Sequence, residues 1–308
     1  MGVYENRMFS GLDIDKELGK GINIYPFNEN NLKENSINLS ASKYAWSMKK
    51  GKVFYDKEGN LYNEDKNNNL REINIYRGKN SVKRIGKKEY IILLPSSTTL
   101  IETKEVIGID KYIGGTYHSK VGIVSLGIGH IGTMVGPNFC GHSLIAIHNV
   151  SDYPLKIDIN DTIVSVIFYN LETPINSNNA TQNGHLDKMS TLGIKLSDDE
   201  LKVINEDWKK DIVKIREKMN SSSEFKAYKK KILKRKFESF KAYINIKNIF
   251  KWCLGGLLLW GTFKICEKID ISNGNITVWR NRFWDVGLSG ILVFILQQVW
   301  SFSNSKKN

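Results

Sequence analysis

Cysteine is scarce in this chain. Only three cysteines occur among 308 residues, Cys140, Cys253 and Cys266. They are too few and too widely spaced for a disulfide scaffold, and they fit a reducing compartment. Residues 1–10 contain no apolar run, so we expect no cleavable secretory signal. Hydrophobic residues make up 41% of the chain and charged residues 25%, a composition that can bury a core and that excludes full disorder.

Net positive charge is nearly absent outside one segment. The chain has a formal net charge of +13, and residues 209–251 alone contain fifteen Lys and Arg against four Asp and Glu. Such a segment can lie on anionic lipid, form a solvated helix face or bind nucleic acid. No recognised nucleic-acid-binding motif accompanies the charge. We therefore expect lipid proximity ahead of a solvated face, and no nucleic-acid partner.

The C-terminal region has two stretches without charge. Residues 286–305 contain no charged side chain, and at about 1.5 Å per residue they are long enough to cross a bilayer. Residues 252–263 are charge-free for only twelve positions and reach spanning length if the flanking lysines lie at the interfaces. We predict transmembrane helices at 249–266 and 286–303. The alternative is a hydrophobic hairpin packed on a soluble domain.

The lysines beside these stretches predict an orientation. They are dense before residue 249 and recur after residue 303, whereas the 267–285 hairpin is balanced in charge. Because basic residues favour the cytoplasmic side, we expect a multi-pass protein of the cell membrane with both chain ends in the cytoplasm.

Two amphipathic helices are predicted between residues 197 and 248. Ser197 and Glu200 form a capping box at the start of the first. Apolar residues then recur every three to four positions up to Met219, and again from Phe225 to Ile244, with a serine run between them. We predict a polar linker at 176–196 and a basic helical connector at 197–248.

The first part of the chain, residues 1–175, shows no long helical period. It consists of short runs, several of them β-branched, that Asn, Gly, Asp and Pro separate. We predict a mainly β body, an antiparallel sandwich or barrel. The expected strands are 52–55, 73–76, 90–94, 100–105, 122–126, 143–148, 155–159 and 163–169.

Five segments of the body, taken in order, resemble the dCTP deaminase/dUTPase family over about residues 22–174. Residues 24–27 (IYPF) and 36–39 (SINL) are similar to its early segment, with Asn38 where Asp is usual. Residues 94–105 resemble the strand that precedes the family's site. Residues 115–120 (GTYHSK) stand in place of its phosphate-binding turn, and residues 136–141 (GPNFCG) match its next loop.

This resemblance implies a distorted β-barrel or jelly-roll that forms a homotrimer with nucleotide sites between subunits. Family members split dUTP into dUMP and pyrophosphate, or deaminate dCTP. The ligand would be a pyrimidine deoxynucleotide or a signalling nucleotide, and Mg²⁺ could accompany a triphosphate. The residues that the resemblance implies for nucleotide or phosphate binding are His118, Ser119, Lys120, His130, Phe139 and Gly141.

The carboxylates of the family's chemistry are missing. Gly136 stands where dUTPases place a water-activating Asp, and Ala146 stands where the deaminases place a Glu. Neither side chain can accept a proton from water, as general-base catalysis requires. Ser165 also replaces a Gln that is common on the last strand. We therefore predict a site that binds but does not catalyse.

Metal binding has little support in the sequence. Cys140, His142 and His148 share strand parity, and His118 and His130 are near in sequence, so a zinc site is conceivable. Their spacing matches no standard zinc motif, and pocket or interface histidines are the better interpretation. We predict no bound structural metal.

Three functional hypotheses follow. The first is a membrane-bound nucleotide sensor or effector without catalytic activity, an arrangement that resembles effectors of bacterial antiviral defence. The second is an active, membrane-tethered dCTP deaminase or dUTPase that uses a displaced base such as Glu105 or His130. The third is a trimeric scaffold that clusters membrane hairpins.

Overall fold

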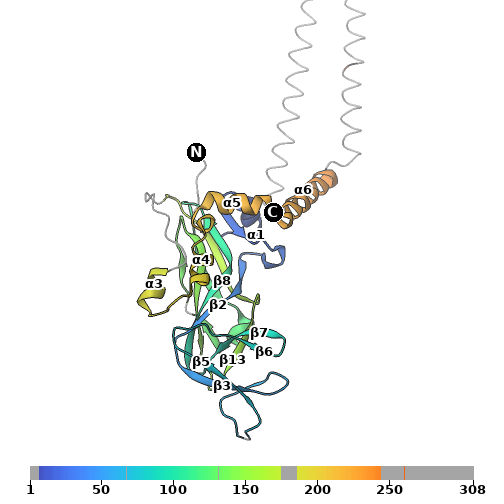
Figure 1. Cartoon of the computed structure of the whole chain (residues 1–308). Helices are drawn as coiled ribbons and strands as arrows, with labels where there is room; N and C mark the ends of the chain where they lie inside the picture. Colours follow the sequence, from blue (N-terminus) through green and yellow to red (C-terminus); the bar gives the residue numbers. More distant parts are fainter. Residues whose placement is uncertain (1–6, 67, 131, 175–185, 244–259, 261–308) are drawn as a thin grey trace, which may run out of the picture. The chain divides into compact units, whose positions relative to one another are not determined.

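The computed structural model describes residues 7–66, 68–130, 132–174, 186–243 and 260 (Figure 1). The chain divides into two compact units, residues 1–230 and 231–308. The first unit contains every strand described below and the site. The second contains the distal part of one basic helix.

A large antiparallel sheet forms the centre of the first unit, with strands in the order β10-β12-β8-β2-β14-β9-β11, and with β1 paired to β8. The paired strands are β1 (Ile22–Tyr25), β2 (Ile37–Ser47), β8 (Ser97–Ile109), β9 (Ile113–Ser119), β10 (Ile128–His130), β11 (Met134–Val135), β12 (Cys140–Asn149) and β14 (Thr162–Asn170).

Two three-stranded sheets complete the β structure, in the orders β13-β7-β6 and β4-β3-β5. Their members are β3 (Gly51–Tyr55), β4 (Leu61–Tyr62), β5 (Arg71–Ile75), β6 (Val82–Ile85), β7 (Lys88–Leu93) and β13 (Leu155–Asp158). A separate apolar cluster that includes Val53, Ile75 and Ile92 lies between them. The prediction of a mainly β body is confirmed.

One predicted strand is wrong. Residues 122–126 contain the helix α2 (Val121–Val124) and the turn that follows it, and the carbonyl of Lys120 accepts the amides of Ile123 and Val124, each at 3.0 Å. The β-branched residues there do not face a core, because Val121 is 85% exposed and Val124 is also exposed. β propensity depends on packing against neighbouring strands, and these exposed residues lack such packing.

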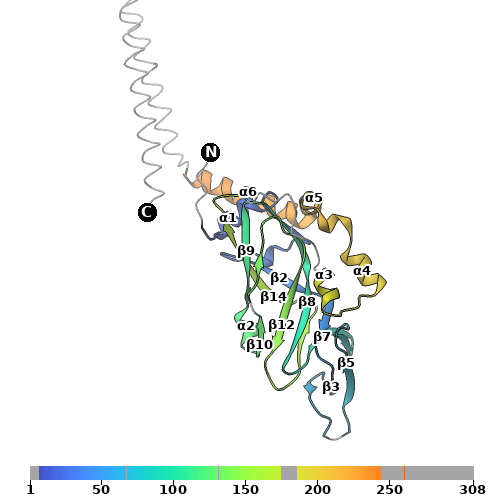
Figure 2. The same ribbon diagram turned by 90° about the vertical axis from the view of Figure 1, so that its left-hand side faces the viewer.

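Apart from α2, the helices lie at the beginning and the end of the described chain. They are α1 (Gly11–Glu17), α3 (Leu186–Thr191), α4 (Asp198–Ile204), α5 (Ile212–Ser221) and α6 (Ser223–Tyr243), with 3-10 helices η1 (Glu29–Asn31) and η2 (Asp207–Lys210). Figures 1 and 2 show α3 and α4 beside the strands β2 and β8. The predicted capping box at Ser197 and Glu200 is confirmed at the start of α4.

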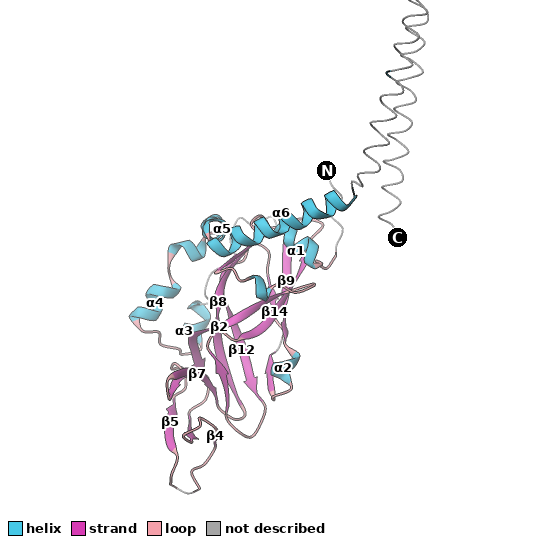
Figure 3. Ribbon diagram, turned by 90° about the vertical axis from the view of Figure 1, so that its right-hand side faces the viewer, coloured by secondary structure: helices cyan, strands magenta, loops and turns pink. Residues whose placement is uncertain are grey.

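The first predicted helix of the connector is interrupted. Instead of one helix to Met219, the chain forms α4, η2 and α5, and the Asp211 carboxylate accepts the amides of Val213 and Lys214 as the cap of α5. The expected serine break holds, since α5 ends at Ser221 and α6 begins at Ser223. Figure 3 shows α5 and the beginning of α6 at one end of the sheet, where Ile215, Met219 and Phe225 are buried.

Among the described residues, no helix has both the length and the apolar character that a membrane span needs. The spans predicted at 249–266 and 286–303 lie outside the described residues, apart from Trp260.

Candidate functional site

A row of polar side chains crosses three strands of the large sheet. Asn38 of β2 pairs with Ser165 of β14, which pairs in turn with His118 of β9. Side chains of directly opposed residues lie on the same face. The Ser165 hydroxyl donates to Oδ1 of Asn38 at 2.7 Å. Two of the positions at which the sequence departs from the family pattern thus stabilise each other.

His118 stands at the accessible end of this row. Its side chain is exposed, and its Nε2 lies 2.9 Å from the Thr116 hydroxyl, which is 3.3 Å from the Tyr169 hydroxyl. Ser119 ends β9 and Lys120 precedes α2. The structure therefore keeps the predicted turn residues together, on a surface that a ligand can reach.

Two lysines place positive charge beside this row. The Lys120 ammonium donates to the Thr162 hydroxyl. Burial lowers the pKa of Lys120, the positive charge of Lys33 lowers it further, and the Asp161 carboxylate opposes both. A phosphate at this point would relieve the repulsion between the two ammonium groups. We call His118, Ser119, Lys120, Ser165 and Lys33 the β9 surface.

The other predicted binding residues lie elsewhere in the chain. Gly141, with φ +135°, is in β12 opposite Ile107, and Phe139 is buried in the turn before it. Since Val135 pairs with Gly115, Gly136 lies about four strand residues, roughly 13 Å, from His118. The two halves of the predicted site do not meet within one chain. His130 lies in β10 opposite Ile147, and its side chain is outside the described set.

Ala146 lies on a face of the sheet that the chain itself covers. Trp46 of β2, Leu100 of β8 and Ala146 of β12 form one row. Met189, Ile194 and Ile204 pack on this row in an apolar cluster. We call residues 186–210 the strap. We call the face of the sheet beneath it, which contains the rows of Trp46, Glu102 and His148, the acid face. Ala146 is half-buried beneath these apolar side chains.

Glu102 is a carboxyl group that the sequence analysis did not single out. It pairs with Leu144, one row from Ala146, on the same face. It is 2% exposed, and neither oxygen has a hydrogen-bond partner. Burial raises its pKa to about 8, although the charge of Lys209 lowers it. At neutral pH the carboxyl group is therefore mainly protonated.

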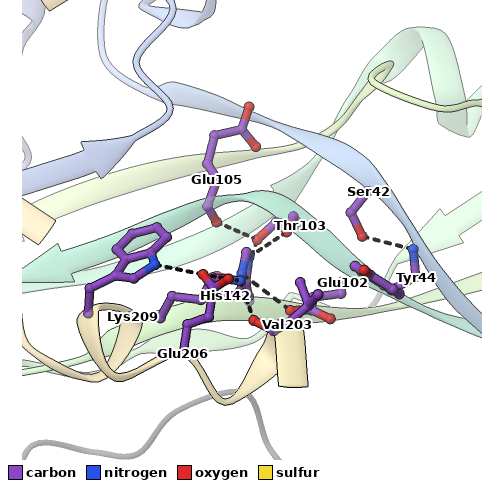
Figure 4. A network of polar contacts seen from close by, with 11 residues as sticks. Ser42, Tyr44, Glu102, Thr103, Glu105, His142, Val203, Glu206 and Lys209 are labelled. Carbon is purple, nitrogen blue, oxygen red and sulfur yellow. Dashed lines mark hydrogen bonds and ion pairs between the residues drawn. The ribbon is translucent and has the colours of Figure 1, made fainter. Parts of the chain in front are cut away.

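His142 lies beside Glu102 in the network of Figure 4. Its Nδ1 is 2.8 Å from the carbonyl oxygen of Thr103, and a carbonyl only accepts, so Nδ1 carries the proton. Burial lowers the pKa of His142 to about 3, which keeps the ring neutral. Its Nε2 lone pair lies 3.5 Å from Oε1 of Glu102, where a protonated carboxyl can direct its hydrogen.

Lys209 is a strap residue that lies beside this pair in Figure 4. It is 6% exposed, and burial lowers its pKa. Its ammonium donates to the carbonyl of Val203 at 2.5 Å and lies 3.6 Å from Oε2 of Glu206. The hydrogen-bond and ion-pair partners of the Lys209 ammonium therefore lie within the strap, and Glu102 is not one of them.

Glu105, the displaced base of the second hypothesis, is already occupied. Its two oxygens accept the Ser40 amide at 2.7 Å and the Asn31 side-chain amide at 3.2 Å. Burial raises its pKa. It lines a pocket of about 530 Å³ together with Lys104, Asn160 and other polar residues. Its two hydrogen bonds to structural donors make it a poor candidate for a mobile general base.

Metal ligation has no geometric support in the part of the chain that the structure describes, where no three His, Cys, Asp or Glu side chains gather. Cys140 packs with Val106 and Ile215, and burial raises the pKa of its thiol to about 11. A protonated, buried thiol does not coordinate zinc. A Mg²⁺ ion carried by a triphosphate takes most ligands from phosphate and water, and Asp161 is the carboxylate of this region that can approach one.

Glu102 could have been found from the sequence. It is a charged residue in a strand that is mostly buried, and it lies in the 94–105 segment that carries the resemblance. Its burial under the strap could not have been found, because strand parity does not tell which segment covers a face.

Known proteins resemble this chain mainly over the body. A dCTP deaminase-like family model matches residues 8–171. The solved dCTP deaminase of Agrobacterium tumefaciens aligns with 54% of this chain and 48% of its own, at 11% identity and a TM-score of 0.37. This chain thus spans about half the length of that enzyme.

Viral dUTPases align over shorter stretches. The Staphylococcus bacteriophage 80alpha dUTPase aligns with 35% of this chain and 94% of its own, at 14% identity and a TM-score of 0.26. The EIAV dUTPase aligns with 34% of this chain and 92% of its own, at 15% identity and a TM-score of 0.25. No curated protein sequence matches the chain.

Proposed function

The chain belongs to the dCTP deaminase-like family through residues 8–171, and from this premise we propose that its body binds a nucleotide without converting it. The observation that carries the proposal is the packing of Met189, Ile194 and Ile204 over Ala146. A deaminase needs a carboxylate and water at this position, whereas this position holds an alanine on which apolar side chains pack.

The β9 surface supports the binding half of the proposal. Lys120 and Lys33 supply positive charge, and His118 and Ser119 add polar groups on an accessible strand end. Such groups bind phosphate through charge-assisted hydrogen bonds. Since Gly136 and Gly141 lie away from this surface within one chain, a homotrimer would complete the site between subunits. Mg²⁺ would arrive with a triphosphate, near Asp161.

A membrane-attached output is the second part of the proposal. Residues 286–305 contain no charge, and the described part of α6 has six Lys and Arg between Lys229 and Lys236, with Leu233 66% and Phe237 67% exposed. A basic helix with exposed apolar residues suits the surface of an anionic membrane. We place the protein at the cell membrane as a sensor or effector, with both ends cytoplasmic and an antiviral role.

Nucleotide binding can change the membrane part only through different affinities for two states. The test is isothermal calorimetry on the detergent-purified full chain with dCTP, dUTP and cyclic nucleotides, each with Mg²⁺. We expect binding by at least one of them and its loss in Lys120→Met, whereas Lys87→Met, in the exposed turn between β6 and β7, keeps it. Absence of binding by all of them contradicts the proposal.

Glu102 favours a second candidate function, an active deaminase or dUTPase. It is a carboxyl group with a pKa of about 8, one row from Ala146. Its 2% exposure argues against this role, because no substrate reaches it while the strap is closed. Conversion of dCTP or dUTP by the full chain, lost in Glu102→Gln, would establish the enzyme.

A trimeric scaffold remains the third candidate. It predicts that the triple variant His118→Ala, Ser119→Ala, Lys120→Ala has the membrane activity of the wild type. Loss of that activity in the triple variant separates a nucleotide-responsive protein from a scaffold.

A further inference from the structure

The acid face carries more unpaired polar atoms than a permanent core of this size should. Both oxygens of Glu102, Nε1 of Trp46 and Nε2 of His148 are buried without a hydrogen-bond partner. The residues lie on successive rows of one face, which Ala146 shares. Buried polar groups are nearly always paired in folded proteins, so four unpaired atoms under one cover require an explanation.

The strap that covers them is held mainly by apolar contacts. Met189, Ile194 and Ile204 are its buried anchors. A hydrogen bond of 3.5 Å joins the Asn80 amide to the Glu200 carboxylate. Among the described residues, no Lys or Arg of the strap forms an ion pair with a carboxylate of the sheet. Its helices α3 and α4 have only six and seven residues, so they have little stability of their own.

The side chains of the acid face are suited to bind a flat, uncharged ring. Leu100, Leu144 and Ala146 form an apolar floor. The Trp46 N–H is a donor, and the carboxyl group of Glu102, when protonated, is both donor and acceptor. His148 lies on the same face, one row beyond Ala146, and its Nδ1 is 2.8 Å from the Thr98 hydroxyl. Polar groups at the margins of an apolar surface orient a small heterocycle.

We infer that the strap is an internal cover which occupies the acid face in the free protein and leaves it when a nucleotide binds, so that Glu102 and Trp46 hydrogen-bond the edge of the base. The inference rests on the proposed function and adds its regulation. The strap ends with η2 and continues into α5, so its displacement also moves the beginning of the helical connector. Binding in this way is weakened by the fraction of molecules in which the strap is closed.

The variant Ile204→Ala tests the cover. Ile204 is 4% exposed and packs on the acid face, and its truncation leaves β8 and β12 intact. The matched control is Ile75→Ala, at a position that is 1% exposed in the separate cluster of the small sheets. The measurements are amide hydrogen exchange of residues 186–210 and calorimetric titration of the full chain with dCTP, dUTP and inorganic tripolyphosphate.

We expect faster exchange of the strap amides in Ile204→Ala and an affinity for dCTP or dUTP about tenfold higher than that of the wild type. Tripolyphosphate, which reaches only the β9 surface, should bind both proteins equally. The Ile75→Ala control should change neither the exchange of the strap nor the affinity. Glu102→Leu should slow the exchange of the strap, since it removes the unpaired oxygens, and should lower nucleotide affinity at least about tenfold.

The outcomes separate the inference from the proposed function. Equal nucleotide affinity of wild type and Ile204→Ala, with faster strap exchange, contradicts the cover alone. If the nucleotide binds both proteins no more tightly than tripolyphosphate does, this result also contradicts the cover alone. Failure of every probe with every variant contradicts the cover and the proposed function together.

Discussion

The β9 surface and the acid face lie on the same sheet and differ in their exposure to solvent and in the pairing of their polar groups. The first is exposed, and its substituted residues Asn38 and Ser165 satisfy each other. The second is covered, and the Glu102 oxygens and Trp46 Nε1 have no hydrogen-bond partner. Phosphate recognition requires accessible cations and hydroxyls, whereas water activation requires a hydrated carboxylate. The proposal that the body binds a nucleotide without converting it rests on this difference.

Restoring the family's acid should have the largest effect. Ala146→Glu places a carboxylate under the strap without a partner, and an uncompensated buried charge costs about 3–5 kcal/mol. We predict a loss of this size in the free energy of unfolding, measured by urea titration. Val121→Glu, at an 85% exposed position, should change stability by less than about 0.5 kcal/mol. Equal stability of both variants would show that the acid face is open.

Removing one cation of the β9 surface should have the next largest effect. A hydrogen bond to a charged group contributes about 1.5–3 kcal/mol, so Lys120→Met should weaken binding of tripolyphosphate about tenfold to hundredfold in calorimetry. Lys33→Met should weaken it in the same direction. If Lys87→Met in the exposed β6–β7 turn has the same effect as Lys120→Met, the attraction is general and the β9 surface is not a site.

Glu102 should make stability depend on pH. Its pKa is about 8 in the folded protein against an ordinary value of 4.5 for a Glu side chain, so between these values the folded state binds a proton that the unfolded state lacks. Stability should therefore fall as pH rises, by about 1.4 kcal/mol per pH unit between pH 6 and 7.

The measurement is the difference in free energy of unfolding between wild type and Glu102→Gln at several pH values. His142, whose lowered pKa acts in the opposite direction, is present in both proteins and cancels. A difference that does not change with pH would mean that Glu102 is hydrated and ionised, and that the strap does not exclude water.

The smallest effect is expected in the polar row. Ser165→Ala leaves Oδ1 of Asn38 without its donor at 2.7 Å, and the loss of one hydrogen bond costs about 1 kcal/mol of stability. Ser125→Ala, whose hydroxyl makes an exposed bond of 3.3 Å, should cost less in the same urea titration. The reverse order would show that the row does not contribute to the sheet.

Local signals predicted much of the fold. Alternation and turn residues located β3, β5, β7, β12, β13 and β14, and the Ser197 capping box located the start of α4. The strand expected at 122–126 failed because β-branched residues there face solvent. The apolar spacing from Leu201 to Met219 predicted helix but not the break at η2, where a new cap at Asp211 begins α5.

The candidate site was predicted only in part. Motif order located His118, Ser119 and Lys120, which are adjacent in the chain. The role of Lys33 depends on a contact with Lys120 that the sequence does not encode locally. The burial of Glu102 depends on a segment about 100 residues later in the chain, which packs on it through tertiary contacts. Such distant contacts leave no periodic signal in the sequence.

The central claim is that this protein binds a nucleotide and leaves it unchanged. Its most direct test is to incubate the full chain with dCTP or dUTP and Mg²⁺, to measure binding by calorimetry, and to separate the nucleotides by chromatography. The account predicts saturable binding and full recovery of the added nucleotide. Appearance of dUMP, or of dUTP from dCTP, at a rate that Glu102→Gln abolishes would contradict it.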